Sequence, residues 1–122
     1  MEWLNNAVFA YRLRWKRRRL LYRAWRKRHQ LRVVADRTGD IRPETILAAV
    51  TVRNEMVRLP FFLEHHRRLG VEHFLVVDND SDDGTREYLC AQPDVSVWGT
   101  KHSYKLSRFG MDWLIWLLIR HA

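Results

Sequence analysis

Carboxylate and hydroxyl side chains gather in residues 78–85, directly after the apolar run 74–77. The apolar run predicts a buried strand, and the segment that opens at Gly84-Thr85 predicts a helix. In open α/β sheets, ligands bind at the carboxyl ends of the strands. Carboxylates crowded at such a place repel one another unless they cap a helix, bind a cation or hydrogen-bond a ligand.

A second polar group ends the apolar strand predicted for residues 46–52: Thr51, Arg53, Asn54 and Glu55. The two loops lie side by side if both strands are parallel, because parallel strands end at one edge of a sheet. A carboxylate there, such as Asp78, can accept a hydrogen bond from a ribose hydroxyl or a base N–H. Each acidic or amide residue taken alone is equally explained as a loop or N-cap residue. Together, at two successive strand ends, they favour a nucleotide site.

Residues 41–122 alternate strands with helices, which predicts an α/β fold with a Rossmann-like parallel sheet and right-handed crossovers. Residues 33–45 are expected to be a linker, because Thr38-Gly39-Asp40 and Arg42-Pro43 interrupt any regular pattern. Three strands leave an exposed edge, so we expect a fragment of a longer domain. The predicted strands are 46–52, 74–77 and 95–98, and the predicted helices are 60–69, 85–91 and about 104–119.

The basic residues are concentrated in an N-terminal arm. Residues 1–40 carry 12 Lys/Arg and 3 Asp/Glu, a net of +9, whereas residues 41–122 have a net of −1. Residues 3–32 are predicted to form a basic amphipathic helix before the globular part. Anionic membrane lipid is our first candidate partner, nucleic acid is the second, and a solvated or docked arm is the alternative. Its apolar stripe comprises Leu4, Val8, Tyr11, Trp15, Tyr22 and Trp25.

Other features restrict the class of protein. The single cysteine, Cys90, excludes an intrachain disulfide framework and fits a reducing compartment. The first residues do not form a signal peptide, and the run 113–119 is too short to span a bilayer. His65 and His66 are adjacent, which is poor spacing for a metal site. We therefore expect a cytoplasmic protein that can also lie at the inner face of a membrane.

The motifs resemble those of one enzyme family. Residues 76–85, Val-Val-Asp-Asn-Asp-Ser-Asp-Asp-Gly-Thr, look like the nucleotide-binding stretch of family 2 glycosyltransferases, which have a GT-A fold. Arg53-Asn54-Glu55 matches their first-strand motif, and residues 59–71 resemble a bacterial subgroup. The segment 103–114 falls where the family's third helix carries a basic residue. The resemblance covers residues 44–120 and implies a GT-A-like nucleotide-binding half-domain.

The resemblance implies a role for each matching position. Asp78 would hold the base of a nucleotide-sugar donor, and Arg108 would approach the base or the diphosphate. Asp80 stands where the family often has Gly, so its match is weaker. The base and ribose site would be lined by Thr51, Arg53 and Glu55, with Asn54 completing their motif. Asp82, Asp83 and Thr85 are expected to cap the second helix.

Two departures from the family limit what this chain can do. The family's metal-binding Asp-x-Asp follows a later strand, so Asp78-Asn79-Asp80 is interpreted as the base-binding carboxylate rather than a metal site. The divalent cation (Mn²⁺ or Mg²⁺) and the catalytic base that the family uses would lie beyond this chain. We therefore predict the nucleotide-binding half of a glycosyltransferase, without catalytic or metal residues of its own. The alternative is a non-catalytic basic module that binds an anionic membrane or nucleic acid.

Overall fold

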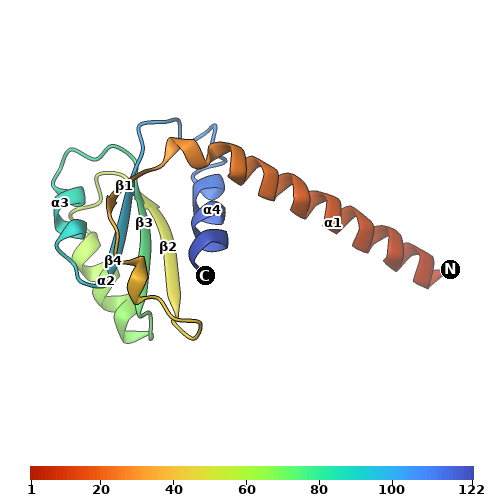
Figure 1. The fold of residues 1–122 in the computed structure, drawn as a ribbon, viewed down its shortest axis with the longest axis horizontal. Coiled ribbons are helices and arrows are strands. Elements are labelled where there is room, and N and C mark those ends of the chain that lie inside the picture. The colour runs from red at the N-terminus through yellow and green to blue at the C-terminus, as the bar shows by residue number, and fades with distance from the viewer.

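The computed structural model describes all residues, 1–122, as a four-stranded mixed sheet between two layers of helices, with one long helix projecting from the body (Figure 1). The strand order is β1-β4-β3-β2. The α/β class and the basic N-terminal helix are therefore confirmed. The elements are α1 (Glu2–Lys27), η1 (Arg28–Gln30), β1 (Arg32–Ala35), η2 (Thr38–Asp40), β2 (Leu47–Val52), α2 (Leu59–Arg68), β3 (His73–Asp78), α3 (Thr85–Cys90), β4 (Val95–Gly99) and α4 (Met111–His121).

The three predicted strands pair in parallel, as expected. Val52 at the end of β2 lies opposite Asp78 at the end of β3, which lies opposite Gly99 at the end of β4. Two successive crossovers in one direction, from β2 to β3 and from β3 to β4, place α2 and α3 on the same face of the sheet. The chain then crosses to the other face, which α4 covers (Figure 1).

The expectation of an all-parallel sheet and a linker at residues 33–45 is wrong at β1. This strand runs antiparallel to β4, with Val33 opposite Trp98, and covers the edge that the prediction left open. Two adjacent β-branched residues, Val33 and Val34, favour the extended backbone. The side chain of Arg37 then fixes the segment by donating to the carbonyl oxygens of Val95 at 3.0 Å and Cys90 at 2.8 Å.

Apolar side chains fill both spaces between sheet and helices. Every residue of β3 is buried, which explains its unbroken apolar run as a central strand. On one face, Leu59 and Leu63 of α2 and Leu89 of α3 pack on the sheet. On the other face, Trp113 and Leu117 of α4 do so. Cys90 is half-buried, and this burial raises the pKa of its thiol, as expected for a packing residue.

The last helix begins later than predicted, at Met111 rather than near residue 104. Residues 104–110 form turns, and Arg108, Phe109 and Gly110 all have positive φ angles, of 57°, 58° and 81°. A right-handed helix cannot pass through such residues. The loop before α4 is therefore a separate structural feature, which contacts the end of β2.

The arm is anchored to the body only at its carboxyl end. Arg23 lies 3.7 Å from the buried carboxylate of Asp112 on α4, and the Trp113 indole donates to Gln30 at 3.0 Å. Ala24 is the one buried residue of α1. The rest of α1 extends away from the sheet (Figure 1). No helix of the chain combines the length and the apolar composition that a bilayer crossing requires.

Stability should fall on mild acidification because His73 is buried in its neutral form. The histidine is 3% exposed, its Nε2 lies 2.9 Å from the Ser96 hydroxyl, and burial lowers its pKa below 6.5. Because the pKa of His73 is lower in the folded chain than in the unfolded chain, the unfolded chain binds the proton first as pH falls. The free energy of unfolding therefore decreases from about pH 6.5 down to the pKa of His73 in the folded chain.

Chemical denaturation across this pH range measures the slope. His73→Gln, which keeps a side-chain amide near Ser96, should flatten the slope without abolishing it, because burial also lowers the pKa of His121. The matched control His65→Gln changes an exposed side chain and should leave the slope unchanged. An unaltered slope in His73→Gln would contradict the assignment.

Candidate functional site

The buried carboxylate of Asp78 lies at the centre of the predicted site. It is fully inaccessible to solvent at the carboxyl end of the central strand. Its Oδ2 accepts a hydrogen bond from Nε of Arg86 at 2.8 Å and a longer one from the Ser81 amide at 3.4 Å. Its Oδ1 is buried without any partner. Buried polar atoms are nearly always paired, so this unpaired oxygen is an exception.

Thr51 approaches the same edge from the other face of the sheet. It pairs in register with Val77, one position before Asp78, and successive side chains of a strand point to opposite faces. Its Oγ1 is also buried without a partner. A Cβ on Gly110 would lie 2.5 Å from this oxygen, so glycine is required for the loop before α4 to pack here. Two unpaired oxygens therefore flank the edge, one on each face.

Four hydrogen bonds join the loop after β2 to the loop after β3. The Asn54 amide N–H donates to Ser81 at 2.9 Å, and the Asn54 side-chain oxygen accepts from the Asp82 amide at 2.8 Å. The remaining two, from the amides of Glu55 and Met56, go to Thr85 Oγ1 at 3.2 Å and Asp83 Oδ2 at 3.1 Å. The predicted adjacency of the two loops is present, but Asn54 uses its side chain to hold them together.

The acidic residues of the second loop differ in their contacts. Asp83 accepts from the Thr85 amide at 3.0 Å and from its hydroxyl, and these bonds lower the pKa of this carboxyl group. Asp83 therefore accepts from the first amide of α3, as expected for a capping residue, whereas the Thr85 hydroxyl bonds Asp83 and the Glu55 amide and does not cap the helix. Asp82 contributes only its backbone N–H, so its predicted capping role is wrong. Gly84, at the N-cap position itself, has no side chain to offer.

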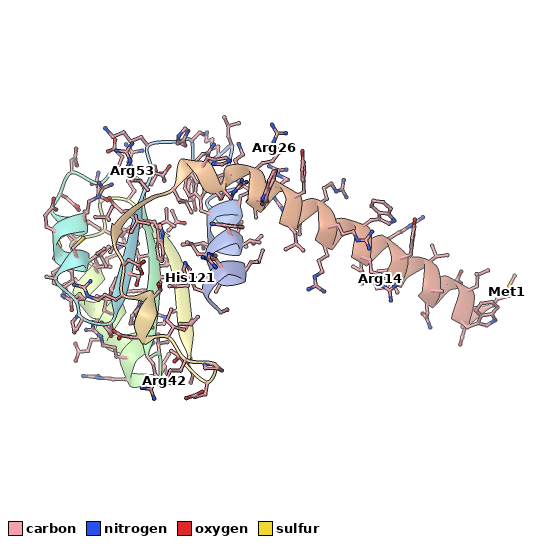
Figure 2. The ribbon with its side chains drawn as sticks, in the orientation of Figure 1. Met1, Arg14, Arg26, Arg42, Arg53 and His121 are labelled. Atoms are coloured by element: carbon pink, nitrogen blue, oxygen red, sulfur yellow. The ribbon has the colours of Figure 1, made fainter.

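The remaining predicted residues lie around this edge. Glu55 is half-buried and, with Thr51, lines a cavity of about 210 Å³ beside β2. Arg53 is exposed at the upper end of the sheet in Figure 2, and Asp80 is exposed in the loop after β3. Arg108 is half-buried in the loop before α4, which contacts Thr51 through Gly110. These side chains surround the edge without forming hydrogen bonds to one another.

Backbone strain is confined to the loops of this edge. All four non-glycine residues with positive φ follow a parallel strand: Asn54 at 50°, Asp80 at 57°, Arg108 at 57° and Phe109 at 58°. Non-glycine residues are disfavoured in this region, and such residues cluster at functional sites. The strain therefore marks the carboxyl edge of the parallel strands independently of the motifs.

Arg86 is the residue of this edge that sequence reasoning missed. It lies in the first turn of α3. The acidic segment before this helix predicts residues that cap the helix, not an ion pair between Asp78 and Arg86. The only available signal is a basic residue eight positions after Asp78, across a loop whose path the sequence does not reveal. No group of three or more His, Cys, Asp or Glu side chains is placed to bind a metal ion.

Comparison of the chain with models of protein families, with curated proteins and with solved structures finds no match. The resemblance to family 2 glycosyltransferases therefore rests on the motifs of this chain and remains a prediction.

Loss of Arg86 should destabilise the fold by leaving the Asp78 carboxylate buried without a counter-charge. Arg86→Leu is expected to lower the free energy of unfolding by about 3 kcal/mol, since removing one partner of a buried ion pair leaves an uncompensated charge. Arg53→Leu, an exposed arginine in the neighbouring loop, should change it by less than about 0.5 kcal/mol. Chemical denaturation gives both values.

The double variant Asp78→Asn/Arg86→Leu tests the cause. Removing the charge of Asp78 should recover part of the stability that Arg86→Leu loses, so the two changes should be non-additive. Additive losses in this cycle would show that Arg86 stabilises the protein by packing rather than by pairing with Asp78.

Proposed function

We propose that the chain binds the nucleotide of a nucleotide-sugar donor and forms the donor-binding half of a glycosyltransferase. The observation that carries the proposal is the fully buried Asp78 carboxylate, whose Oδ1 has no partner at the carboxyl end of β3. A ligand N–H at that oxygen would complete its hydrogen bonding in a site from which water is excluded.

The topology supports a ligand at this edge. The helices α2 and α3 cover one face of the sheet, and α4, which follows β4, covers the other (Figure 1). Rossmann-like sheets bind nucleotides at the carboxyl ends of their strands, which is the edge where Asp78 lies. The sheet is consistent with the GT-A-like half-domain that the motifs imply, and we propose that architecture for it.

Each site residue then has a role that its position allows. Asp78 Oδ1 accepts from the base, and the unpaired Thr51 Oγ1 can bond to the base or the ribose from the other face. Glu55 and Arg53 extend from the adjacent loop toward the ribose. Arg108 supplies positive charge near the diphosphate, and Asn54 holds the loops in register. Asp80, exposed and strained, lies at the rim.

The reaction proposed for the whole enzyme is transfer of the sugar to an acceptor hydroxyl. The hydroxyl oxygen forms a bond to the anomeric carbon, the bond from that carbon to the diphosphate breaks, and the nucleoside diphosphate leaves with the electron pair. A general base takes the hydroxyl proton, and a divalent cation neutralises the leaving diphosphate. This chain's part is to bind and orient the nucleotide.

A second surface supports the predicted membrane partner. The stripe residues of α1 are exposed, with Trp15 at 53% and Tyr22 at 57%. Guanidinium groups lie over these rings, Arg18 at 5.6 Å from Trp15 and Arg26 at 6.0 Å from Tyr22. Aromatic rings beside basic groups suit the interface of an anionic bilayer. We propose that α1 lies on such a surface and holds the protein at the inner face of a membrane.

Calorimetric titration with UDP and other nucleoside diphosphates, with and without Mn²⁺, tests the donor site. Asp78→Asn should weaken binding about tenfold or more, the effect of losing one hydrogen bond to a charged group. The Asn amide oxygen can still accept from Arg86, which turns the NH₂ group toward the position where Oδ1 accepted from the base.

Asp82→Asn is the matched control, because it removes one charge from the same loop without removing a side-chain hydrogen bond. It should bind as the wild type does. If the folded wild-type chain binds no nucleoside diphosphate, the donor-site proposal fails.

Sedimentation with vesicles tests whether the arm binds an anionic membrane. Phosphatidylcholine vesicles containing phosphatidylglycerol should bind the chain, and binding should decrease with added salt. Trp15→Ala should weaken it, whereas Phe61→Ala, which removes an exposed ring from α2, should not. Salt-dependent binding to duplex DNA without binding to vesicles would instead favour the nucleic-acid alternative.

A further inference from the structure

A basic cavity lies on the other side of Asp78 from β2. It has a volume of about 390 Å³ and opens between η1, β1 and the end of β4. None of its lining residues is acidic, and none is among the predicted donor-site residues. Five of the lining residues have basic side chains: His29, Arg32, Arg86, Lys101 and His102.

The guanidinium of Arg86 is positioned for a ligand in this cavity. Its Nε donates to Asp78 at 2.8 Å, and its two terminal nitrogens form no hydrogen bond within the chain. The side chain is 33% exposed. A planar guanidinium held by Nε presents its free N–H groups as a fixed pair, which matches two oxygens of a phosphate.

Gly99 provides the space for this arrangement. A Cβ at this position would lie 2.8 Å from Nη2 of Arg86 and 3.3 Å from Cγ2 of Val34. Gly99 does not have a positive φ, so the backbone does not require glycine here. The absence of a side chain therefore serves the close approach of Arg86 to the end of β4.

The remaining basic groups come from segments that are distant in the sequence. The antiparallel register places Arg32 of β1 directly opposite Gly99. Lys101 and His102 follow the end of β4, where the His102 amide donates to Thr100 Oγ1 at 3.1 Å and so orders the turn. The only carboxylate in contact with these groups is that of Asp78, which lies buried behind Arg86. The cavity thus concentrates positive charge that an anion would neutralise.

We propose that the basic cavity binds a phosphate or diphosphate group through ion pairs and hydrogen bonds with Arg86, Arg32 and Lys101. This site is separate from the donor site and does not depend on the glycosyltransferase proposal. The phosphate can belong to a soluble molecule or to a lipid headgroup, since η1 connects the cavity to the arm.

Calorimetry with inorganic pyrophosphate tests the site. Lys101→Ala and Arg32→Ala should each weaken binding roughly tenfold, as expected for the loss of one charge-assisted contact. Arg42→Ala at the opposite end of the sheet and Arg14→Ala on the arm remove the same charge elsewhere (Figure 2). Both controls should bind as the wild type does, and equal weakening by all four would show non-specific attraction and overturn the proposal.

Gly99→Ala tests geometry without changing charge. The new methyl group displaces the end of the flexible Arg86 side chain, so binding should weaken several-fold while the protein stays folded. Gly39→Ala is the matched control, because its Cβ would meet no atom within 4 Å and its φ is not positive. Wild-type affinity in Gly99→Ala would contradict the role of Arg86.

Two further measurements identify the source of the phosphate and distinguish this proposal from the donor-site proposal. Phosphatidylcholine vesicles containing phosphatidic acid that compete with pyrophosphate, and lose this competition in Lys101→Ala, would assign the site to a headgroup. Pyrophosphate binding without such competition would assign it to a soluble phosphate. If UDP binds and neither phosphate probe does, this inference fails while the donor site stands. Because UDP also carries a diphosphate, UDP binding that Lys101→Ala weakens as much as it weakens pyrophosphate binding, and that Asp78→Asn leaves unchanged, would support this inference and overturn the donor-site proposal.

Discussion

The ion pair between Asp78 and Arg86 is the interaction on which the carboxyl edge of the sheet depends. A fully buried carboxylate at the end of the central strand needs a partner, and Arg86 supplies it at 2.8 Å from the first turn of α3. The pair leaves one unbonded group on each side. Oδ1 of Asp78 is buried without a partner, and Arg86 lines the basic cavity with its terminal nitrogens free of hydrogen bonds to the chain. One internal contact therefore positions both candidate sites.

The loops around this pair are held in place before any ligand arrives. Hydrogen bonds from Asn54 to Ser81 and Asp82 join the first loop to the second, and Gly110 brings the third loop against Thr51. The positive φ of Asn54 is disfavoured, and its hydrogen bonds to Ser81 and Asp82 offset the cost. A site whose loops are already ordered loses less conformational entropy on binding, which favours affinity. The strained residues and the hydrogen-bonded residues are thus two aspects of one preorganised edge.

The sequence predicted the elements whose pattern is local and missed those that depend on distant contacts. The apolar run of β3, which Figure 1 shows at the centre of the sheet, and Gly70 after α2 were sufficient to place those elements. Strand β1 was missed because its pairing with β4 spans more than sixty residues and its own signal is only Val33-Val34. Thr51 and Asp78 were identified from their positions at the strand ends. The Asp78–Arg86 pair was missed because it depends on the path of the loop between the two residues. The basic cavity was missed because the antiparallel register of β1 brings Arg32 to it.

The arm and the body are connected through η1, which follows α1 and lines the basic cavity. Helix α1 ends at Lys27. The contacts of Arg23 with Asp112 and of Gln30 with Trp113 fix the end of α1 and η1 on α4. His29 of η1 lines the basic cavity. The end of α1, η1 and the basic cavity are therefore adjacent in the structure. An anionic surface that attracts the arm also raises the local concentration of anionic headgroups beside the cavity. The basic cavity thus combines His29 and Arg32 of the basic N-terminal region with Arg86, Lys101 and His102 of the nearly neutral body.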